Sequence, residues 1–98
     1  MIIIKTTYPK LNQAKNLAKI LLTKKLAACV QFSKIESLYQ WQNKIVAEKE
    51  ILVVIKTKAN LYQKIEKEIL QNHPYKIPQI IWFKVDGGFK AYFDWVGL

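Results

Sequence analysis

The sequence contains no arginine, so all 16 of its basic residues are lysines, set against 7 acidic residues for a formal charge of +9. Bidentate recognition of phosphate or guanine favours the arginine fork, and a lysine-only excess spread along the chain is typical of a solvated surface. An acyl-phosphate hydrolase needs a phosphate cradle, and the chain has neither an arginine nor a glycine-rich loop to build one. The charge therefore predicts no nucleic-acid partner.

Cysteine and long apolar runs are almost absent as well. Cys29 is the only cysteine, which excludes an internal disulfide and a four-cysteine zinc site. The N-terminal stretch 1–4 is too short for the core of a signal peptide and meets Lys5 at once. No stretch approaches the ~20 apolar residues of a membrane span. We therefore expect no membrane partner and a cytoplasmic location.

A nucleophile–base–orienter set is also missing, because the chain has one histidine, one cysteine and no aspartate before Asp86. Each reactive group has a structural interpretation too. Cys29 can be a small buried hydrophobe, His73 a helix-end residue, and Lys56 a strand-end lysine whose amine reaches solvent. Cys29 and His73 alone provide too few ligands for a closed metal site unless another subunit contributes. We therefore expect that the protein is not an enzyme.

What the chain does have is a long predicted β-hairpin from Cys29 to Thr57, with its turn at 42–44, where Asn43 tolerates positive φ. Each strand of about 13 residues spans roughly 40 Å, whereas a globular protein with as many residues as this chain has a radius of gyration of only about 13 Å. The tip is nevertheless apolar, and an isolated apolar hairpin end is unstable. We predict that another copy of the chain buries the tip; the alternative is two shorter strands flanking a disordered loop. The apolar tip residues are Leu38, Tyr39, Trp41, Ile45 and Val46.

The apolar pattern of the first hairpin strand changes phase along its length. Val30 and Phe32 occupy even positions, whereas Ile35, Tyr39 and Trp41 occupy odd positions. Such a change is what a bulge or a bend produces, so we expect one near 33–34.

The other segments complete the order βαββαβ. A strand is predicted at 2–7, a helix with apolar residues from Leu11 to Leu22, a second helix capped by Asn60, a last strand from Ile77 to Val85, and a short closing helix at 92–96. This order predicts an α+β, ferredoxin-like sandwich over a single domain, 1–98, with a four-stranded antiparallel sheet and both main helices on one face. The opposite face needs a cover, which again favours a homo-oligomer.

Two other kinds of protein with this element order are excluded by their residues. An RNA-recognition module needs aromatic residues on its central strands, and the stretches 2–7 and 48–56 contain none. A metallochaperone needs two cysteines in a C-x-x-C loop after the first strand, and 6–9 contains none.

Five ordered segments that span nearly the whole chain resemble the CutA family of divalent-cation tolerance proteins. They are Lys25–Cys29, Ser37–Trp41 with Lys44–Ile45, Ile55–Thr57, His73–Pro78 and Tyr92–Val96. The resemblance implies a ferredoxin-like protomer, a homotrimer intertwined through the long hairpin, a cytoplasmic location, and tolerance to or binding of divalent metals, copper above all.

The copper ligands that the resemblance implies are only partly present. The family's cysteine at the end of the first strand and its His-His pair correspond here to Thr6, Asn72 and His73. Only His73 remains a good soft-metal ligand, so we expect weak copper binding or a different site. Cys29 matches another cysteine of the family pattern and is the second candidate metal residue.

A second hypothesis is a small-molecule sensor or interaction scaffold that binds a small anion in a polar–aromatic cleft between subunits. The candidate lining residues of that cleft are Lys56, Tyr39, Trp41, Tyr75 and Trp95.

Overall fold

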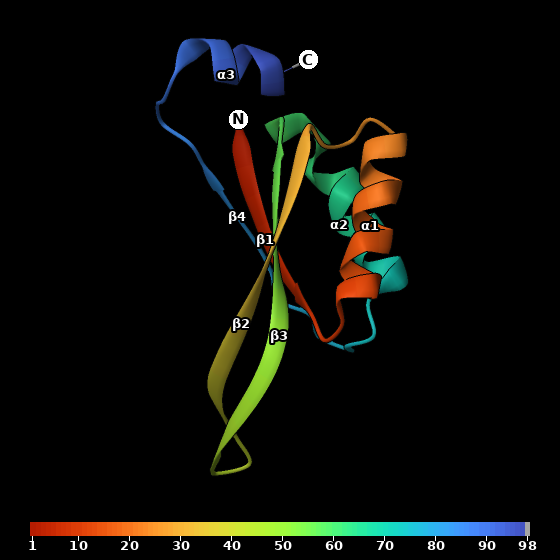
Figure 1. Cartoon of the computed structure of the whole chain (residues 1–98), viewed down its shortest axis with the longest axis vertical. Helices are drawn as coiled ribbons and strands as arrows, with labels where there is room; N and C mark the ends of the chain where they lie inside the picture. The colour runs from red at the N-terminus through yellow and green to blue at the C-terminus, as the bar shows by residue number, and fades with distance from the viewer. Residues whose placement is uncertain (98) are drawn as a thin grey trace.

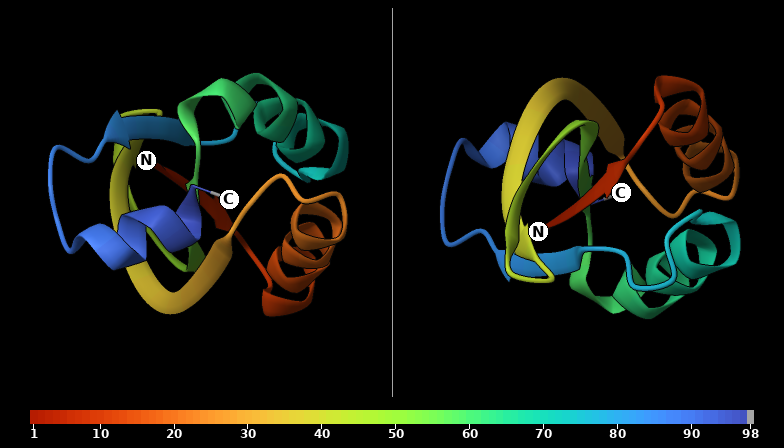
Figure 2. Two further views of the ribbon diagram at one scale, coloured as in Figure 1. Left: turned by 90° about the horizontal axis from the view of Figure 1, so that it is seen from above. Right: turned by 90° about the horizontal axis from the view of Figure 1, so that it is seen from below.

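The computed structural model describes residues 1–97, which form a four-stranded antiparallel sheet with two helices packed on one face. The strand order is β2-β3-β1-β4 (Figure 1). Figure 2 shows α1 and α2 together on one side, with α3 apart from them at one end of the sheet. The ferredoxin-like prediction is confirmed. The elements are β1 (Ile2–Tyr8), α1 (Leu11–Thr23), β2 (Cys29–Trp41), β3 (Lys44–Thr57), a 3-10 turn (Ala59–Leu61), α2 (Tyr62–Asn72), β4 (Ile80–Lys84) and α3 (Lys90–Val96).

The core lies between the sheet and the two long helices. Side chains alternate across a strand, and partners in register share a face, so Ile4 of β1 and its partner Ile55 of β3 point together toward the helices. Leu21 of α1 and Ile69 of α2 meet them there, and all four side chains are completely buried. We call the opposite side of the sheet the open face. It carries the odd positions of β1, β2 and β4 and the even positions of β3.

The hairpin has the predicted length and turn. β2 and β3 pair without interruption from Cys29↔Lys56 to Trp41↔Lys44. Gln42 and Asn43 have φ values of 51° and 63°, as a two-residue type I′ turn requires. β1 pairs with β3 only from Ile51 onward, so residues 35–41 and 44–50 extend beyond the rest of the domain (Figure 1). We call these residues the outer hairpin; they make the molecule 46 Å long but only 26 by 21 Å across.

Of the bulge or bend predicted near 33–34, the bulge is wrong, because the β2–β3 register is continuous through Ser33↔Leu52 and Lys34↔Ile51. The phase change has another cause. Near the base of β2, the even residues Val30 and Phe32 face the helices, as their buried partners Ile55 and Val53 do. Beyond the helices, three apolar residues of β2, Ile35, Tyr39 and Trp41, occupy odd positions and lie on the open face, whereas Leu38 of β2 and Ile45 of β3 lie on the helix side. The strand keeps its register, and the open side becomes apolar as well.

Two other boundaries differ from the prediction. The last strand begins at Ile80 instead of Ile77, since Pro78 has no N–H to donate to a ladder and the segment before Ile80 does not pair. Asn60 does not cap α2 but lies inside the 3-10 turn, and Leu61 precedes the helix without a side-chain cap.

The C-terminal end of α1 offers a stabilising substitution. Lys25 has a φ of 58°; its N–H donates to the Leu22 carbonyl and the N–H of Leu26 donates to the Leu21 carbonyl, the pattern of a Schellman motif. Glycine is favoured at this left-handed position because its lack of Cβ removes a strain of roughly 1 kcal/mol. Lys25→Gly is therefore expected to raise the free energy of unfolding by about that amount in urea denaturation. An equal gain from Lys24→Gly, at a position with negative φ, would contradict this reasoning.

Candidate ligand and interface sites on the sheet

His73 follows α2 directly, and both of its ring nitrogens are engaged in hydrogen bonds. Nε2 lies 2.6 Å from the backbone carbonyl of Thr7, which can only accept, so Nε2 carries the proton. Nδ1 accepts a hydrogen bond of 3.1 Å from the backbone N–H of Tyr75. The imidazole therefore ties the segment after α2 to the end of β1, and it has no free lone pair for a metal ion.

Aromatic rings enclose the same imidazole. It stacks on Tyr8 at a centroid distance of 4.3 Å and lies 5.0 Å from the ring of Tyr75. Burial lowers the pKa of His73 below its usual 6.5, and the hydrogen bond to the Thr7 carbonyl and the charge of Glu50 only partly offset this. His73 is therefore held in its neutral form.

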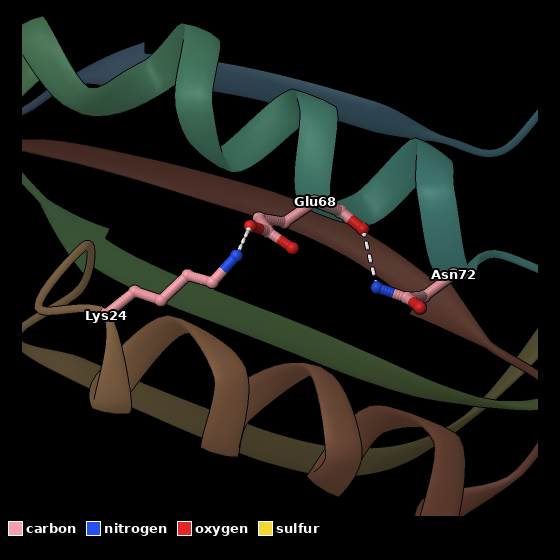
Figure 3. Close-up of polar contacts among 3 residues, drawn as sticks. All are labelled: Lys24, Glu68 and Asn72. Atoms are coloured by element: carbon pink, nitrogen blue, oxygen red, sulfur yellow. Dashed lines mark hydrogen bonds and ion pairs between the residues drawn. The ribbon is translucent and has the colours of Figure 1, made fainter.

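The other two positions at which the resemblance implies metal ligands do not join His73. The Thr6 side chain is completely buried on the helix side of the sheet, and its hydroxyl oxygen has no hydrogen-bond partner among the described residues. The Asn72 side-chain amide donates to the Glu68 carbonyl of its own helix at 3.0 Å, while the Glu68 carboxylate pairs with Lys24 of α1 (Figure 3). The residues present therefore do not fit a copper site at this place.

Cys29, the second candidate metal residue, lies elsewhere on the sheet. It pairs with Lys56 on β3, whereas Thr7, which binds His73, pairs with Leu52. Four residues of strand separate these two pairs, about 13 Å. Residues 1–97 contain no group of three or more His, Cys, Asp or Glu side chains that could hold a metal ion.

Lys56 forms a first polar–aromatic group with α3 on the open face. Its amine donates a 3.0 Å hydrogen bond to the Tyr92 hydroxyl and lies 5.2 Å from the centre of the Tyr92 ring. Tyr92 stacks on Trp95 at 5.7 Å. Lys56 and Trp95 were predicted from the sequence as lining residues of a cleft, whereas Tyr92 was not. The spacing of Tyr92 and Trp95, three residues apart on a helix, was the signal that both share one face.

Tyr39 and Tyr75 form a second group at the outer hairpin, each with a glutamate of β3. The Tyr39 hydroxyl donates to Glu48 at 2.6 Å, and the Tyr75 hydroxyl donates to Glu50 at 3.3 Å. The bond to Glu48 raises the pKa of Tyr39, and burial together with Glu50 raises the pKa of Tyr75 to about 12. Neither glutamate was predicted from the sequence as a site residue, although their even positions on β3 place them on the face that carries Lys56.

The predicted cleft is therefore divided in a single protomer. Lys56 and Trp95 lie at one end of the open face, and Tyr39 and Tyr75 lie six to eight residues away along β3, about 20–26 Å. Trp41, at the tip, is 62% exposed. The two groups can form one cleft only if a second copy brings its outer hairpin to the first.

The neutral His73 makes stability depend on pH. Its pKa is lowered in the folded protein, so below about pH 6.5 the unfolded chain binds a proton that the folded chain does not. We expect the free energy of unfolding to fall between pH 6.5 and the lowered pKa, and to fall less in His73→Gln. Urea denaturation of both proteins from about pH 8 to about pH 5 gives the difference between their free energies of unfolding at each pH. The carboxylates contribute equally to both proteins and cancel in this difference. Parallel pH profiles would contradict the assignment.

Fold and sites together define a class: a ferredoxin-like α+β protomer with an overlong central hairpin and two polar–aromatic groups on its open face. A family model described as "CutA1 divalent ion tolerance protein" matches residues 2–97, and the chain therefore belongs to this family.

Known relatives are similar to this chain in sequence over most of its length. The divalent-cation tolerance protein CutA of Pyrococcus horikoshii is 34% identical over 96 residues, covering 98% of this chain and 94% of the relative. The structure of CutA1 from Shewanella sp. SIB1 has a TM-score of 0.92 at 38% identity and covers 97% of this chain and 90% of that one. The chloroplastic CutA protein of Arabidopsis thaliana is 34% identical, and this chain covers only 53% of its length.

The names of two relatives mention different compartments. The Arabidopsis protein is named chloroplastic, and a structure from Archaeoglobus fulgidus, with a TM-score of 0.92 at 36% identity, which covers 98% of this chain and 95% of that one, is described as that of a periplasmic protein. Within residues 1–97, no helix is long and apolar enough to cross a membrane. The cytoplasmic location stays a prediction.

Proposed function

We propose that this member of the divalent-cation tolerance family acts as a non-catalytic homotrimer in the cytoplasm, in tolerance to or sensing of divalent metals such as copper. The observation that carries the proposal is the outer hairpin. Leu38 is 71% exposed, Ile45 81% and Trp41 62%, on a two-stranded ribbon without a helix or third strand to cover it. Such a ribbon is marginal in water, and its exposed apolar surface favours burial by other copies.

The number of copies rests on the family resemblance, which implies a homotrimer. The structure supports a head-to-tail arrangement, because the outer hairpin and the open face of the main domain are different surfaces. When one copy's hairpin covers the next copy's open face, the contact is heterologous, and such contacts close into a ring if the rotation allows.

Direct copper binding by His73 is expected to be weak. A copper ion at either ring nitrogen would have to replace the hydrogen bond to Thr7 or the one from Tyr75, and Thr6 and Asn72 supply no soft ligand. Cys29 is too far away to help. We infer that metal tolerance, if it involves direct binding, uses a site that several copies build together.

Native mass spectrometry during a titration with Cu(II) tests both parts of this proposal. We expect a mass of about 34.5 kDa, three times the 11.5 kDa chain, without stoichiometric copper at equimolar metal. If only the 11.5 kDa monomer is detected at micromolar protein concentration, the trimer is contradicted. One tightly held copper per chain that disappears in His73→Gln would contradict the assignment of His73.

A second candidate function is a scaffold that senses a small anion. The Lys56 amine has a hydroxyl and an aromatic ring as its partners but no carboxylate among the described residues, so it is free to bind an anion. Calorimetric titration with inorganic phosphate tests this candidate. Binding that is lost in Lys56→Gln would support it, and the absence of heat at millimolar phosphate would count against it.

A further inference from the structure

The charged residues of the open face are separated by sign. The main domain contributes two lysines to this face: Lys5 at the centre of β1 and Lys56 near the end of β3. The outer hairpin contributes Glu48 and Glu50, which project from β3 on the same side as Lys56, together with Lys44 at the turn. One end of the face is thus cationic, and the projecting ribbon is mainly acidic.

Neither Lys5 nor Lys56 has an acidic partner within residues 1–97. The Lys5 amine lies 5.7 Å from the centre of the Phe83 ring, and the Lys56 amine contacts Tyr92. If a second copy covers the open face, both amines lose water. A buried charge without a partner costs several kcal/mol, so the covering surface has to supply carboxylates.

The chain has only seven acidic residues from which these carboxylates can come. Glu66 bonds to Tyr62, Glu68 pairs with Lys24, and Asp94 pairs with Lys90. Of the other four, Asp86 follows β4 and Glu36 lies at an even position of β2, on the helix side of the hairpin. Glu48 and Glu50 are therefore the acidic pair that shares the open face with the lysines.

We infer that Glu48 and Glu50 of one copy pair with Lys5 and Lys56 of the next copy. This inference rests on the proposed self-association and names the contacts that direct it. Within one chain the groups do not meet: Glu48 and Lys56 are eight residues apart on one strand, about 26 Å, and Glu50 is four residues, about 13 Å, from the position opposite Lys5. The contact is therefore between copies.

The spacing of the two pairs is compatible with this contact. Glu48 and Glu50 are two residues apart on one strand, about 6.6 Å. Lys5 lies opposite Val54, which is two residues from Lys56, so the two lysines are about 8 Å apart across adjacent strands. Tyr39 and Tyr75 each use one acceptor site of a glutamate, and a carboxylate offers about four. Both glutamates can therefore accept a lysine in addition.

Charge reversal tests the inference. Lys5→Glu with Lys56→Glu, and separately Glu48→Lys with Glu50→Lys, place like charges across the interface, which costs several kcal/mol. We expect the concentration at which half of the trimer dissociates to rise about 100-fold or more in each double variant. The variant that carries all four reversals should recover most of the assembly. Lys64→Glu with Lys67→Glu, on the exposed surface of α2, makes the same change in net charge as the reversal of Lys5 and Lys56 and should leave assembly unchanged.

Two milder double variants, Lys5→Gln with Lys56→Gln and Glu48→Gln with Glu50→Gln, separate a loss of assembly from a loss of folding. They should fold by circular dichroism and still weaken the trimer at least about tenfold. Wild-type assembly in either glutamine pair, or no recovery in the fourfold reversal, would overturn the inference and leave the trimer intact as a proposal. A monomeric wild-type protein would overturn both.

Discussion

Trp41→Ala is expected to shift the protein from the proposed trimer to smaller species at concentrations where the wild type stays assembled. In a solitary chain this side chain is 62% exposed, and its loss would change stability little. In an assembly that covers the outer hairpin, truncating a buried tryptophan costs about 3–5 kcal/mol per copy. Sedimentation velocity and thermal melting measure the effect. The melting temperature should also become more dependent on protein concentration.

Leu70→Ala is a matched control for this substitution. Leu70 is 53% exposed on α2, in the helix layer and not on the hairpin, so its removal should leave the assembly unchanged. If Trp41→Ala and Leu70→Ala behave alike, with the trimer mass and melting temperature of the wild type, the tip is not buried.

His73→Ala is expected to lower the free energy of unfolding by about 3 kcal/mol at neutral pH. The substitution removes two hydrogen bonds, worth about 1 kcal/mol each, and an aromatic stack worth about 0.5–1.5 kcal/mol. It also leaves the Thr7 carbonyl without its partner. Urea denaturation at constant protein concentration measures the loss. Because the imidazole has no free lone pair, the affinity of the folded protein for Cu(II) should not change.

Asn72→Ala provides the comparison at the neighbouring position. Its amide makes one exposed hydrogen bond to Glu68, so we expect a loss below about 1 kcal/mol. A His73→Ala protein as stable as the wild type but unable to bind copper would show that His73 is a ligand and not a structural residue.

The sequence predicted the fold because its strongest patterns are local. Asn43 at a positive-φ turn and the unbroken apolar run at 51–55 indicated a hairpin with a covered base. The same feature indicates the hairpin and motivates the proposed partners, since its apolar residues continue past the end of the domain. The bulge is absent because alternation reports which side of a strand is apolar, and beyond the helices apolar residues occupy the open side as well.

The sites were harder to predict because they depend on contacts between distant segments. The neutral state of His73 depends on the Thr7 carbonyl, 66 residues earlier, and a backbone acceptor leaves no mark in a sequence. Lys56 and Tyr92 are 36 residues apart. Tyr39, Trp41, Tyr75, Lys56 and Trp95 were grouped as one cleft, but the protomer divides them between two ends of the open face. Whether assembly reunites them stays a prediction.

Hydrogen exchange of the wild-type protein tests most directly whether neighbouring copies shield the outer hairpin. Amides of residues 35–41 and 44–50 should exchange as slowly as those of β1, since opening them would require the assembly to open. Exchange of these amides within seconds, while those of β1 remain protected, would show a ribbon left to the solvent and would contradict the account.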